Sequence, residues 1–406
     1  MNTYLVGGAV RDKLLNISNQ DRDWLVVGST AEEMQSLGYL PVGKDFPVFL
    51  HPESKEEYAL ARTEKKVGKG YTGFECYFSP DVTLEEDLLR RDLTINAIAQ
   101  DPTGRIIDPY NGQQDIQNKL LRHVSSAFTE DPLRVLRVAR FAAKLYHLGF
   151  TVAEETMALM RSMAQSGELN HLTAERVWQE WYKSLCTHSP QVFLSTLRDC
   201  GALAIVLPEL DCLFGIPQPP KWHPEVDTGI HTLMVAEQAA KLTESPTIRF
   251  AAQLHDLGKG ATPENEWPSH KKHEFRGLKI IEQLCERLRL PKEYKQLALI
   301  VCEQHTNVHR ANELKATTKL KILNKLDVWR KPARLEEVLL CCQADHAGRL
   351  GLEEQPYPQK ATFLKAYQAA NTITAQSVIA DGIQGSEIRV ELDRRRIAAI
   401  QSITLS

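Results

Sequence analysis

A glycine turn near the start of the chain carries residues suited to binding phosphate. The segment Gly7-Gly8-x-x-Arg11-Asp12 directly follows an apolar run, and a helix is expected after the turn. Two glycines let the backbone come close to a ligand, while the first N–H groups of a helix and the Arg11 guanidinium suit phosphate oxygens. Alone, this turn is equally well explained as a plain strand–turn–helix with a solvated arginine.

Two aspartates just downstream supply candidate metal ligands. Asp21 and Asp23 are two residues apart, so they would project from one face of a strand that continues apolar through Val27. Two carboxylates so placed repel each other unless a cation lies between them, and Mg²⁺ is the usual cation in sites that also bind substrate phosphates. With the glycine turn, this pair predicts a metal-dependent attack of a 3′-hydroxyl on the α-phosphate of a nucleoside triphosphate. Glu57 is a candidate third carboxylate, and an ordinary surface glutamate is an equally good interpretation.

Arg90-Arg91-Asp92 could contact the nucleotide. It precedes an apolar helical run, so its arginines suit the triphosphate. The Asp92 carboxylate could accept a hydrogen bond from a ribose hydroxyl, which would favour a ribonucleotide. The alternative is an exposed basic turn capped by Asp92.

A further helix could read the base. Asp131 precedes Pro132, which predicts a helix that starts at the proline with Asp131 as its N-cap. Arginines then recur at every third residue, at Arg134, Arg137 and Arg140. Asp131 and Arg134 could present donors and acceptors to a base edge while the other two hold phosphates; the alternative is a solvated basic face.

A second set of candidate metal ligands lies in the carboxyl-terminal half. Its histidines and aspartates occur in the order His231, His255, Asp256, His273, His305 and Asp345. Imidazoles combined with carboxylates favour a transition metal such as Ni²⁺ or Mn²⁺ over Mg²⁺, and such a metal can activate water for phosphoester hydrolysis. A lone histidine is usually structural, but the His-Asp-Leu-Gly-Lys run with these partners favours metal binding.

The elements that must position these residues fall into two classes. Over the first hundred residues the apolar pattern predicts a mixed sheet with helices packed on it, with strands at 4–6, 24–27, 48–50 and 58–62 and helices at 10–15 and 31–37. From about residue 128 the apolar spacing becomes helical, which predicts helices at 132–147, 153–165, 174–185 and 190–200. The proline-rich segment 215–228 is the best linker candidate.

Composition fits a soluble globular protein, with 43% hydrophobic and 25% charged residues and a net charge of -3. This balance does not indicate nucleic-acid binding, although a basic groove can lie on an acidic body. The cysteines form no C-x-x-C motif, which argues against a zinc ribbon or a disulfide framework. We find no signal peptide and no apolar run near the length of a membrane span, so a cytoplasmic protein that does not enter a membrane is expected.

As a set, the amino-terminal segments resemble the class II tRNA nucleotidyltransferases of the polymerase-β superfamily. The glycine turn and the two aspartates resemble the catalytic motif of that family, and residues 90–99 resemble its ribose-selecting motif. Residues 108–112 are similar to its hinge segment, residues 130–134 to its protein-template motif, and Arg137 with Arg140 to its last arginine motif. The match covers about the first 150 residues and is specific because the motifs occur together, in order and at the right spacing.

This resemblance implies template-independent addition and repair of the 3′-terminal CCA of tRNA from CTP and ATP, with release of pyrophosphate. It implies that Asp21 and Asp23 bind Mg²⁺ and that Asp131 and Arg134 pair with the incoming base, so that base selection lies in the protein. The other nucleotide-binding residues that it implies are Gly8, Arg11, Arg91, Asp92, Arg137 and Arg140.

The carboxyl-terminal set resembles HD-domain metal phosphohydrolases, and an attached HD domain is typical of the multifunctional CCA proteins of some bacteria. The resemblance implies phosphatase, 2′-nucleotidase and 2′,3′-cyclic phosphodiesterase activities. It also implies an α+β fold, with a polymerase-β-like nucleotidyltransferase head followed by an all-helical neck, body and tail. The implied domains are a head at 1–115, a neck and body at 116–224, an HD domain at 225–347 and a tail at 348–406.

Two other functions stay open on the sequence alone. A poly(A) polymerase, or an enzyme that adds only CC or only A, would share these motifs, although the intact segment 130–134 and the short chain without a basic tail argue against a poly(A) polymerase. The second alternative is a catalytically inactive tRNA-binding or chaperone-like module, against which the intact Asp21 and Asp23 argue. The expected partners are tRNA, CTP and ATP, and the default expectation is a monomer, with a homodimer as the alternative.

Overall fold

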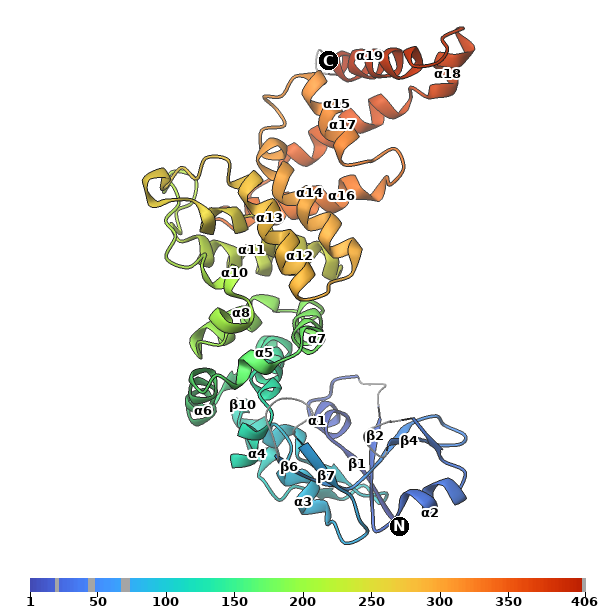
Figure 1. Ribbon diagram of the computed structural model, residues 1–406, viewed down its shortest axis with the longest axis vertical. Coiled ribbons are helices and arrows are strands. Elements are labelled where there is room, and N and C mark those ends of the chain that lie inside the picture. Colours follow the sequence, from blue (N-terminus) through green and yellow to red (C-terminus); the bar gives the residue numbers. More distant parts are fainter. Residues whose placement is uncertain (19–21, 43–47, 67–73, 404–406) are drawn as a thin grey trace. The chain divides into compact units, whose positions relative to one another are not determined.

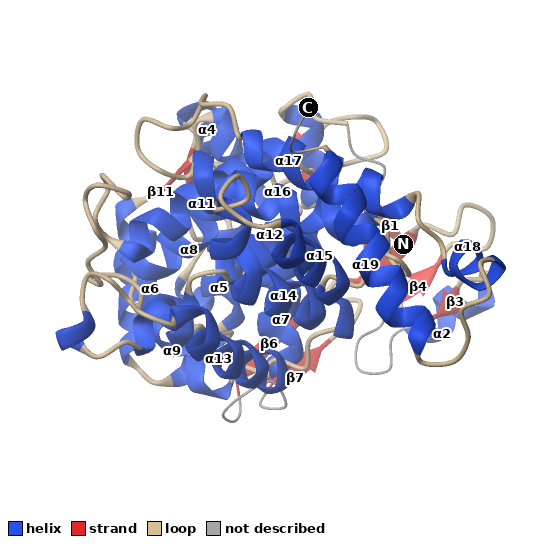
Figure 2. Ribbon diagram, turned by 90° about the horizontal axis from the view of Figure 1, so that it is seen from above, coloured by secondary structure: helices blue, strands red, loops and turns tan. Residues whose placement is uncertain are grey.

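The computed structural model describes residues 1–18, 22–42, 48–66 and 74–403, which fold as two compact units. The first unit comprises residues 1–184 and 192–206, and the second comprises 185–191 and 207–406. Helices make up most of the described chain, and all of the described strands belong to the first unit (Figures 1 and 2). The predicted α+β class, a mixed sheet followed by a helical remainder, is confirmed. The finer division into four domains stays a prediction.

A mixed sheet lies in the amino-terminal part of the first unit. Its strands are β1 (Asn2–Val6), β2 (Asp23–Val27), β3 (Leu40–Pro41), β4 (Val48–Leu50), β5 (Glu57–Leu60), β8 (Ala99–Gln100) and β9 (Ile106–Ile107). They are ordered β3-β4-β5-β2-β1-β8-β9, with β2 antiparallel to β1 and parallel to β5. A separate hairpin joins β6 (Thr63–Lys66) to β7 (Phe74–Tyr77), and β10 (Leu120–Leu121) pairs in parallel with β11 (Thr151–Val152).

Both faces of β2 are buried over most of its length, and the candidate metal ligand Asp23 lies at its exposed first residue. Leu25 packs in one apolar cluster with Leu88, and the next residue, Val26, packs in another with Phe49. This alternation follows from the two-residue period of a strand. Asp23, the first residue of β2, is exposed.

Helices complete the first unit. Six of them lie at positions predicted from the sequence, with bounds that differ by at most two residues, whereas α3, α4 and α9 were not predicted. They are α1 (Gly8–Leu14), α2 (Ala31–Ser36), α3 (Leu84–Leu89), α4 (Gly112–Asn118), α5 (Leu133–Leu145), α6 (Glu154–Gln165), α7 (Ala174–Leu185), α8 (Pro190–Asp199) and α9 (Leu203–Val206). The predicted start of α5 at Pro132 is one residue early: Pro132 takes the N-cap position, and the Asp131 carboxylate accepts a hydrogen bond from the Leu133 N–H at 3.0 Å.

The second unit is helical throughout its described part. Its helices are α10 (Pro208–Asp211), α11 (Thr228–Leu242), α12 (Pro246–Leu254), α13 (His273–Arg287), α14 (Lys292–His309), α15 (Ala316–Lys325), α16 (Ala333–Ala347), α17 (Pro358–Asn371), α18 (Ala375–Ala380) and α19 (Glu387–Ser402). The interpretation of residues 215–228 as a linker is wrong, because this segment lies within the second unit. Among the described residues, no helix combines the length and apolar character needed to cross a membrane.

Candidate functional site

The glycine turn joins β1 to α1 and brings two arginines together. Gly7 caps α1 with φ 66°, a left-handed conformation that favours glycine. A methyl group on Gly7 would lie 3.0 Å from Arg91 Nη1, so the turn also accommodates that side chain. Arg11, on the first turn of α1, is buried and donates to the side chains of Asp12 at 2.8 Å and Asn96 at 2.5 Å.

The strand register places two carboxylates side by side. Asp23 and Glu57 are the first residues of β2 and β5, and they are direct partners in the parallel pairing. Both are exposed and line the same pocket. The other predicted ligand, Asp21, lies outside the described residues. The register therefore supports Glu57 as a third carboxylate beside the predicted pair.

Asp92 is a buried acceptor with several partners. Its carboxylate accepts from Arg137 Nε at 2.7 Å and from Asn96 Nδ2 at 3.0 Å. Arg91 is held in turn by the buried Asp87, 3.1 Å from its Nη2. These contacts fix the arginine guanidinium groups before any ligand binds.

Helix α5 carries the predicted base-reading and phosphate-binding residues. Asp131 accepts from Arg176 at 2.8 Å, and the buried Arg134 donates to the Ala127 carbonyl at 2.5 Å. Arg140 pairs with Glu180 at 2.5 Å. The Phe141 ring lies against three guanidinium groups, 5.0 Å from that of Arg11, 5.7 Å from that of Arg137 and 4.2 Å from that of Arg140.

These side chains line one pocket of about 720 Å³, which we call the nucleotide pocket. Every described residue predicted for the first site lines it: Gly8, Arg11, Asp23, Arg91, Asp92, Asp131, Arg134, Arg137 and Arg140. Sequence reasoning missed four further cations on its wall, Arg62, Lys144, Arg176 and Lys183. A pocket with carboxylates at one edge and many cations elsewhere suits a metal–triphosphate complex.

We expect Asp92→Asn to reduce stability in a manner that depends on pH. Burial alone would raise the pKa of Asp92, but the charges of Arg137 and Arg134 and the hydrogen bonds from Arg137 and Asn96 together outweigh burial and lower the pKa. A lowered pKa means that the ion pair stabilises the fold fully above the ordinary value of about 3.9, and that this contribution is lost as pH falls through the folded-state pKa. In urea unfolding, the free energy of unfolding of Asp92→Asn should be about 1–3 kcal/mol lower than that of wild type at neutral pH. This difference should shrink below about pH 4. A difference that stays constant down to about pH 2 would contradict this assignment.

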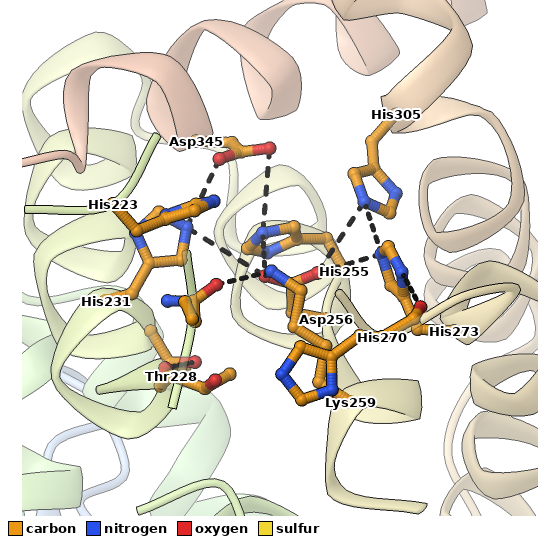
Figure 3. Close-up of polar contacts among 12 residues, drawn as sticks. His223, Thr228, His231, His255, Asp256, Lys259, His270, His273, His305 and Asp345 are labelled. Atoms are coloured by element: carbon orange, nitrogen blue, oxygen red, sulfur yellow. Dashed lines mark hydrogen bonds and ion pairs between the residues drawn. The ribbon is translucent and has the colours of Figure 1, made fainter. Parts of the chain in front are cut away.

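In the second unit, six predicted residues converge from five helices and their ends (Figure 3). We call this set the histidine cluster; it consists of His231, His255, Asp256, His273, His305 and Asp345. All six side chains are buried or nearly so. The Asp227 carboxylate caps α11 by accepting from the Ile230 N–H at 2.9 Å, which sets His231 on the first turn. A methyl group on Gly258 would lie 1.9 Å from the His273 carbonyl oxygen, so only glycine lets the chain after His255 approach α13 this closely.

The imidazoles of the cluster are oriented by backbone carbonyls. In each of the four histidines, Nδ1 lies at hydrogen-bond distance from a backbone carbonyl oxygen. The pairs are His231 with Gly348 (3.1 Å), His255 with Ala252 (2.8 Å), His273 with His270 (3.0 Å) and His305 with Cys302 (2.9 Å). With Nδ1 donating, each neutral ring turns the lone pair of Nε2 inward, the arrangement typical of metal-binding histidines.

Inside the cluster, hydrogen-bond acceptors face each other. Nε2 of His273 and Nε2 of His305 are 3.2 Å apart, and His255 Nε2 lies 3.1 Å from Asp256 Oδ2. His255 Nε2 and Asp256 Oδ1 are buried and make no hydrogen bond within the described part of the chain. Facing lone pairs need a shared proton or a metal ion between them, and the imidazole and carboxylate ligands gathered here fit divalent metal ions.

The ligand atoms form two groups. One is His231, His255 and Asp345, and the other is Asp256, His273 and His305; within each, the ligand atoms lie within 4.8 Å of one another. Burial would raise the pKa of Asp256 and Asp345, but their neighbours together outweigh burial and hold both pKa values well below the ordinary range. These neighbours are His255 and Lys259 for Asp256, and His309, His255 and Arg349 for Asp345. These carboxylates are therefore ionised and ready to bind a cation.

Several neighbours were missed by sequence reasoning. Lys259 Nζ lies 2.6 Å from Asp256, and His309 Nε2 lies 2.6 Å from Asp345. His223 and Glu225, from the proline-rich segment, form a further group with His231, whose Nδ1 is 3.0 Å from Glu225 Oε1. Burial lowers the pKa of His223 to about 4, so it is neutral at physiological pH. His309 is four residues after His305, a spacing that could have revealed it.

The chain matches three family models: the poly A polymerase head domain over residues 3–122, a probable RNA and SrmB-binding site of polymerase A over residues 149–213, and the HD domain over residues 228–349. It is 70% identical over 403 residues to the Multifunctional CCA protein of Vibrio cholerae, covering 99% of this chain and 100% of the relative. The Multifunctional CCA protein of Vibrio vulnificus is 69% identical over 406 residues, covering 100% of both chains.

Solved structures share the fold. A CCA-adding enzyme of Bacillus stearothermophilus in complex with CTP superposes with a TM-score of 0.67 at 22% identity, covering 99% of this chain and 89% of that chain. A CCA-adding enzyme of Thermotoga maritima in complex with tRNA gives a TM-score of 0.63 at 20% identity, covering 98% of this chain and 87% of that chain.

Proposed function

Because this chain belongs to the family of multifunctional CCA proteins, CCA-adding tRNA nucleotidyltransferases with an HD domain, we propose that its two units carry two separate phosphate chemistries. The nucleotide pocket transfers CMP and AMP from CTP and ATP to the 3′ end of tRNA with release of pyrophosphate, and the histidine cluster hydrolyses phosphoesters. The observation that supports separate sites is that the residues lining each come from one unit only.

For nucleotidyl transfer, Asp21 and Asp23 would hold Mg²⁺, with Glu57 as a third carboxylate at the same edge of the sheet. Bound there, Mg²⁺ supplies positive charge that stabilises the transition state and the leaving pyrophosphate. Arg11, Arg137 and Arg140 bind the triphosphate, and the 3′-hydroxyl of tRNA attacks the α-phosphate. The guanidinium groups of these three arginines are already held by Asp92, Glu180 and the Phe141 ring, so little reorganisation is needed when the triphosphate binds.

We assign base selection to Asp131 and Arg134, which are fixed by Arg176 and the Ala127 carbonyl. Arg134→Ala should lower the preference for CTP and ATP over UTP and GTP by roughly 10- to 100-fold, since one hydrogen bond to a charged group contributes about 1.5–3 kcal/mol. The measurement is kcat/KM for each nucleotide on tRNA that lacks its CCA end. Equal losses for all four nucleotides would show that Arg134 only supports the fold of the pocket.

For the histidine cluster we propose a metal-dependent phosphohydrolase with phosphatase, 2′-nucleotidase and 2′,3′-cyclic phosphodiesterase activities. Its donor set of imidazoles and carboxylates favours Ni²⁺ or Mn²⁺ over Mg²⁺. A metal held there activates water and neutralises phosphate charge. Lys259, which donates to Asp256 at 2.6 Å and also to Gln218, adds a fixed positive charge at the floor of the cavity.

The partners that we propose are tRNA, CTP and ATP, in the cytoplasm, for an enzyme that works as a monomer. The two chemistries suit a single task. A tRNA that ends in a 2′,3′-cyclic phosphate has no free 3′-hydroxyl, so the histidine cluster would have to clear that end before the nucleotide pocket could extend it.

A further inference from the structure

An exposed tryptophan lies on the wall of the cavity above the histidine cluster. Trp222 is 59% exposed, yet it lines the same cavity of about 840 Å³ as Asp256, His273, His305 and Asp345. Isolated exposed apolar side chains are ordinary on protein surfaces. A large aromatic ring in a cavity that also carries candidate metal ligands is a different case, because a ligand bound to those residues shares the cavity with the ring.

The chain holds this tryptophan in place through its neighbours. The N–H groups of Trp222 and His223 both donate to the Pro219 carbonyl, each at 3.0 Å, which forms a tight turn. The buried His223 ring lies 4.7 Å from the His231 ring, and its Nδ1 lies 2.9 Å from Glu225. The backbone of Trp222 is thus tied directly to a side chain that packs against the cluster.

The charges around the ring match an anionic ligand. Lys221 Nζ lies 4.8 Å from the centre of the Trp222 ring, and Lys259, Arg310 and Arg349 line the same cavity. The cations alone would be sufficient to bind inorganic phosphate. A nucleoside phosphate needs both features, because its base has an aromatic face and its phosphate carries charge.

We propose that Trp222 is a stacking platform for the base of the nucleotide whose phosphate reaches the histidine cluster. The inference rests on the proposed phosphohydrolase activity and adds the residue that contacts the base of its nucleotide substrate. That nucleotide could be a free nucleoside 2′-phosphate or the terminal nucleotide of an RNA, and both offer the same base, ribose and phosphate.

The test compares substrates with and without a base on the full-length, Ni²⁺-loaded enzyme. For Trp222→Ala, kcat/KM for adenosine 2′-monophosphate should fall about 5- to 150-fold, the range that base–aromatic stacking contributes. The rate with glycerol 2-phosphate, a phosphomonoester without a base, should stay within about twofold of wild type because the platform has nothing to stack on. Trp222→Phe should restore most of the loss. Phe275→Ala is the matched control, since Phe275 is an aromatic residue of the same unit that is 62% exposed and is not among the residues lining the cavity.

Equal losses on substrates with and without a base, or no loss on any substrate that carries a base, would overturn the proposal. An oligoribonucleotide that ends in a 2′-phosphate forms a third arm: a Trp222 effect on it alone would assign the platform to RNA ends, and an effect on the mononucleotide as well would assign it to any nucleoside phosphate. If wild type hydrolyses none of these substrates, the phosphohydrolase proposal has failed. Calorimetric affinities for adenosine 2′-monophosphate then decide the platform separately, and equal values for wild type and Trp222→Ala would overturn it.

Discussion

Asp23→Ala should lose incorporation of CTP and ATP into tRNA by about 10³-fold or more. Metal-held charge contributes several kcal/mol to the stabilisation of such a transition state, and each 1.4 kcal/mol changes the rate tenfold. The measurement is transfer of labelled nucleotides to tRNA that lacks its CCA end. Asp23 is exposed at the end of β2, so its removal should leave the fold intact, which thermal unfolding would verify.

Glu57→Gln refines this prediction. Glu57 lies directly opposite Asp23 in the parallel register, so as a third carboxylate it should matter less than Asp23 but still measurably, whereas a surface glutamate would have no effect. Phosphate release by the histidine cluster should be unchanged in both variants, because the residues lining the two sites belong to different units. Full incorporation by Asp23→Ala would mean that the metal assignment is wrong.

His255→Ala should show the opposite pattern, losing metal-dependent phosphate release by about 10³-fold while it adds CTP and ATP at the wild-type rate. His255 belongs to the ligand group of His231 and Asp345, and its Nε2 makes no hydrogen bond within the described part of the chain, so a metal ion is the partner that its lone pair fits. Phosphate release should be measured with Ni²⁺ and Mn²⁺, next to metal content by mass spectrometry.

The control for this variant is His188→Ala, because His188 is an exposed histidine of the second unit outside the ligand groups. It should keep both activities and full metal content. If His255→Ala kept its phosphate release and Asp23→Ala lost it, the hydrolytic activity would belong to the nucleotide pocket.

The sequence alone predicted much of both sites because their ligands lie in short motifs tied to local structure. The glycine turn, β2 and the arginine helix α5 occur where the apolar pattern and turn residues put them. The role of Glu57 stayed open because it depends on which strand pairs with β2 and in what register, and neither is encoded locally.

The residues that were missed are positioned by long-range packing. His223 and Glu225 lie in a proline-rich segment that resembles a linker, and only the folded second unit brings them to His231. Trp222 belongs to no sequence motif, and its place on the cavity wall depends on the turn in which its N–H donates to the Pro219 carbonyl. Arg176 on α7 reaches Asp131 on α5 only through tertiary structure.

The most direct test of the two-site account uses one RNA substrate that needs both chemistries. A tRNA that lacks CCA and ends in a 2′,3′-cyclic phosphate is incubated with Mg²⁺, Ni²⁺, CTP and labelled ATP. Wild type should clear the end and extend it to CCA, Asp23→Ala should clear it without extension, and His255→Ala should do neither. An equimolar mixture of the two variants should restore extension, because each supplies the site that the other lacks. Extension by His255→Ala alone at the wild-type rate, or a mixture that stays inactive, would contradict the account.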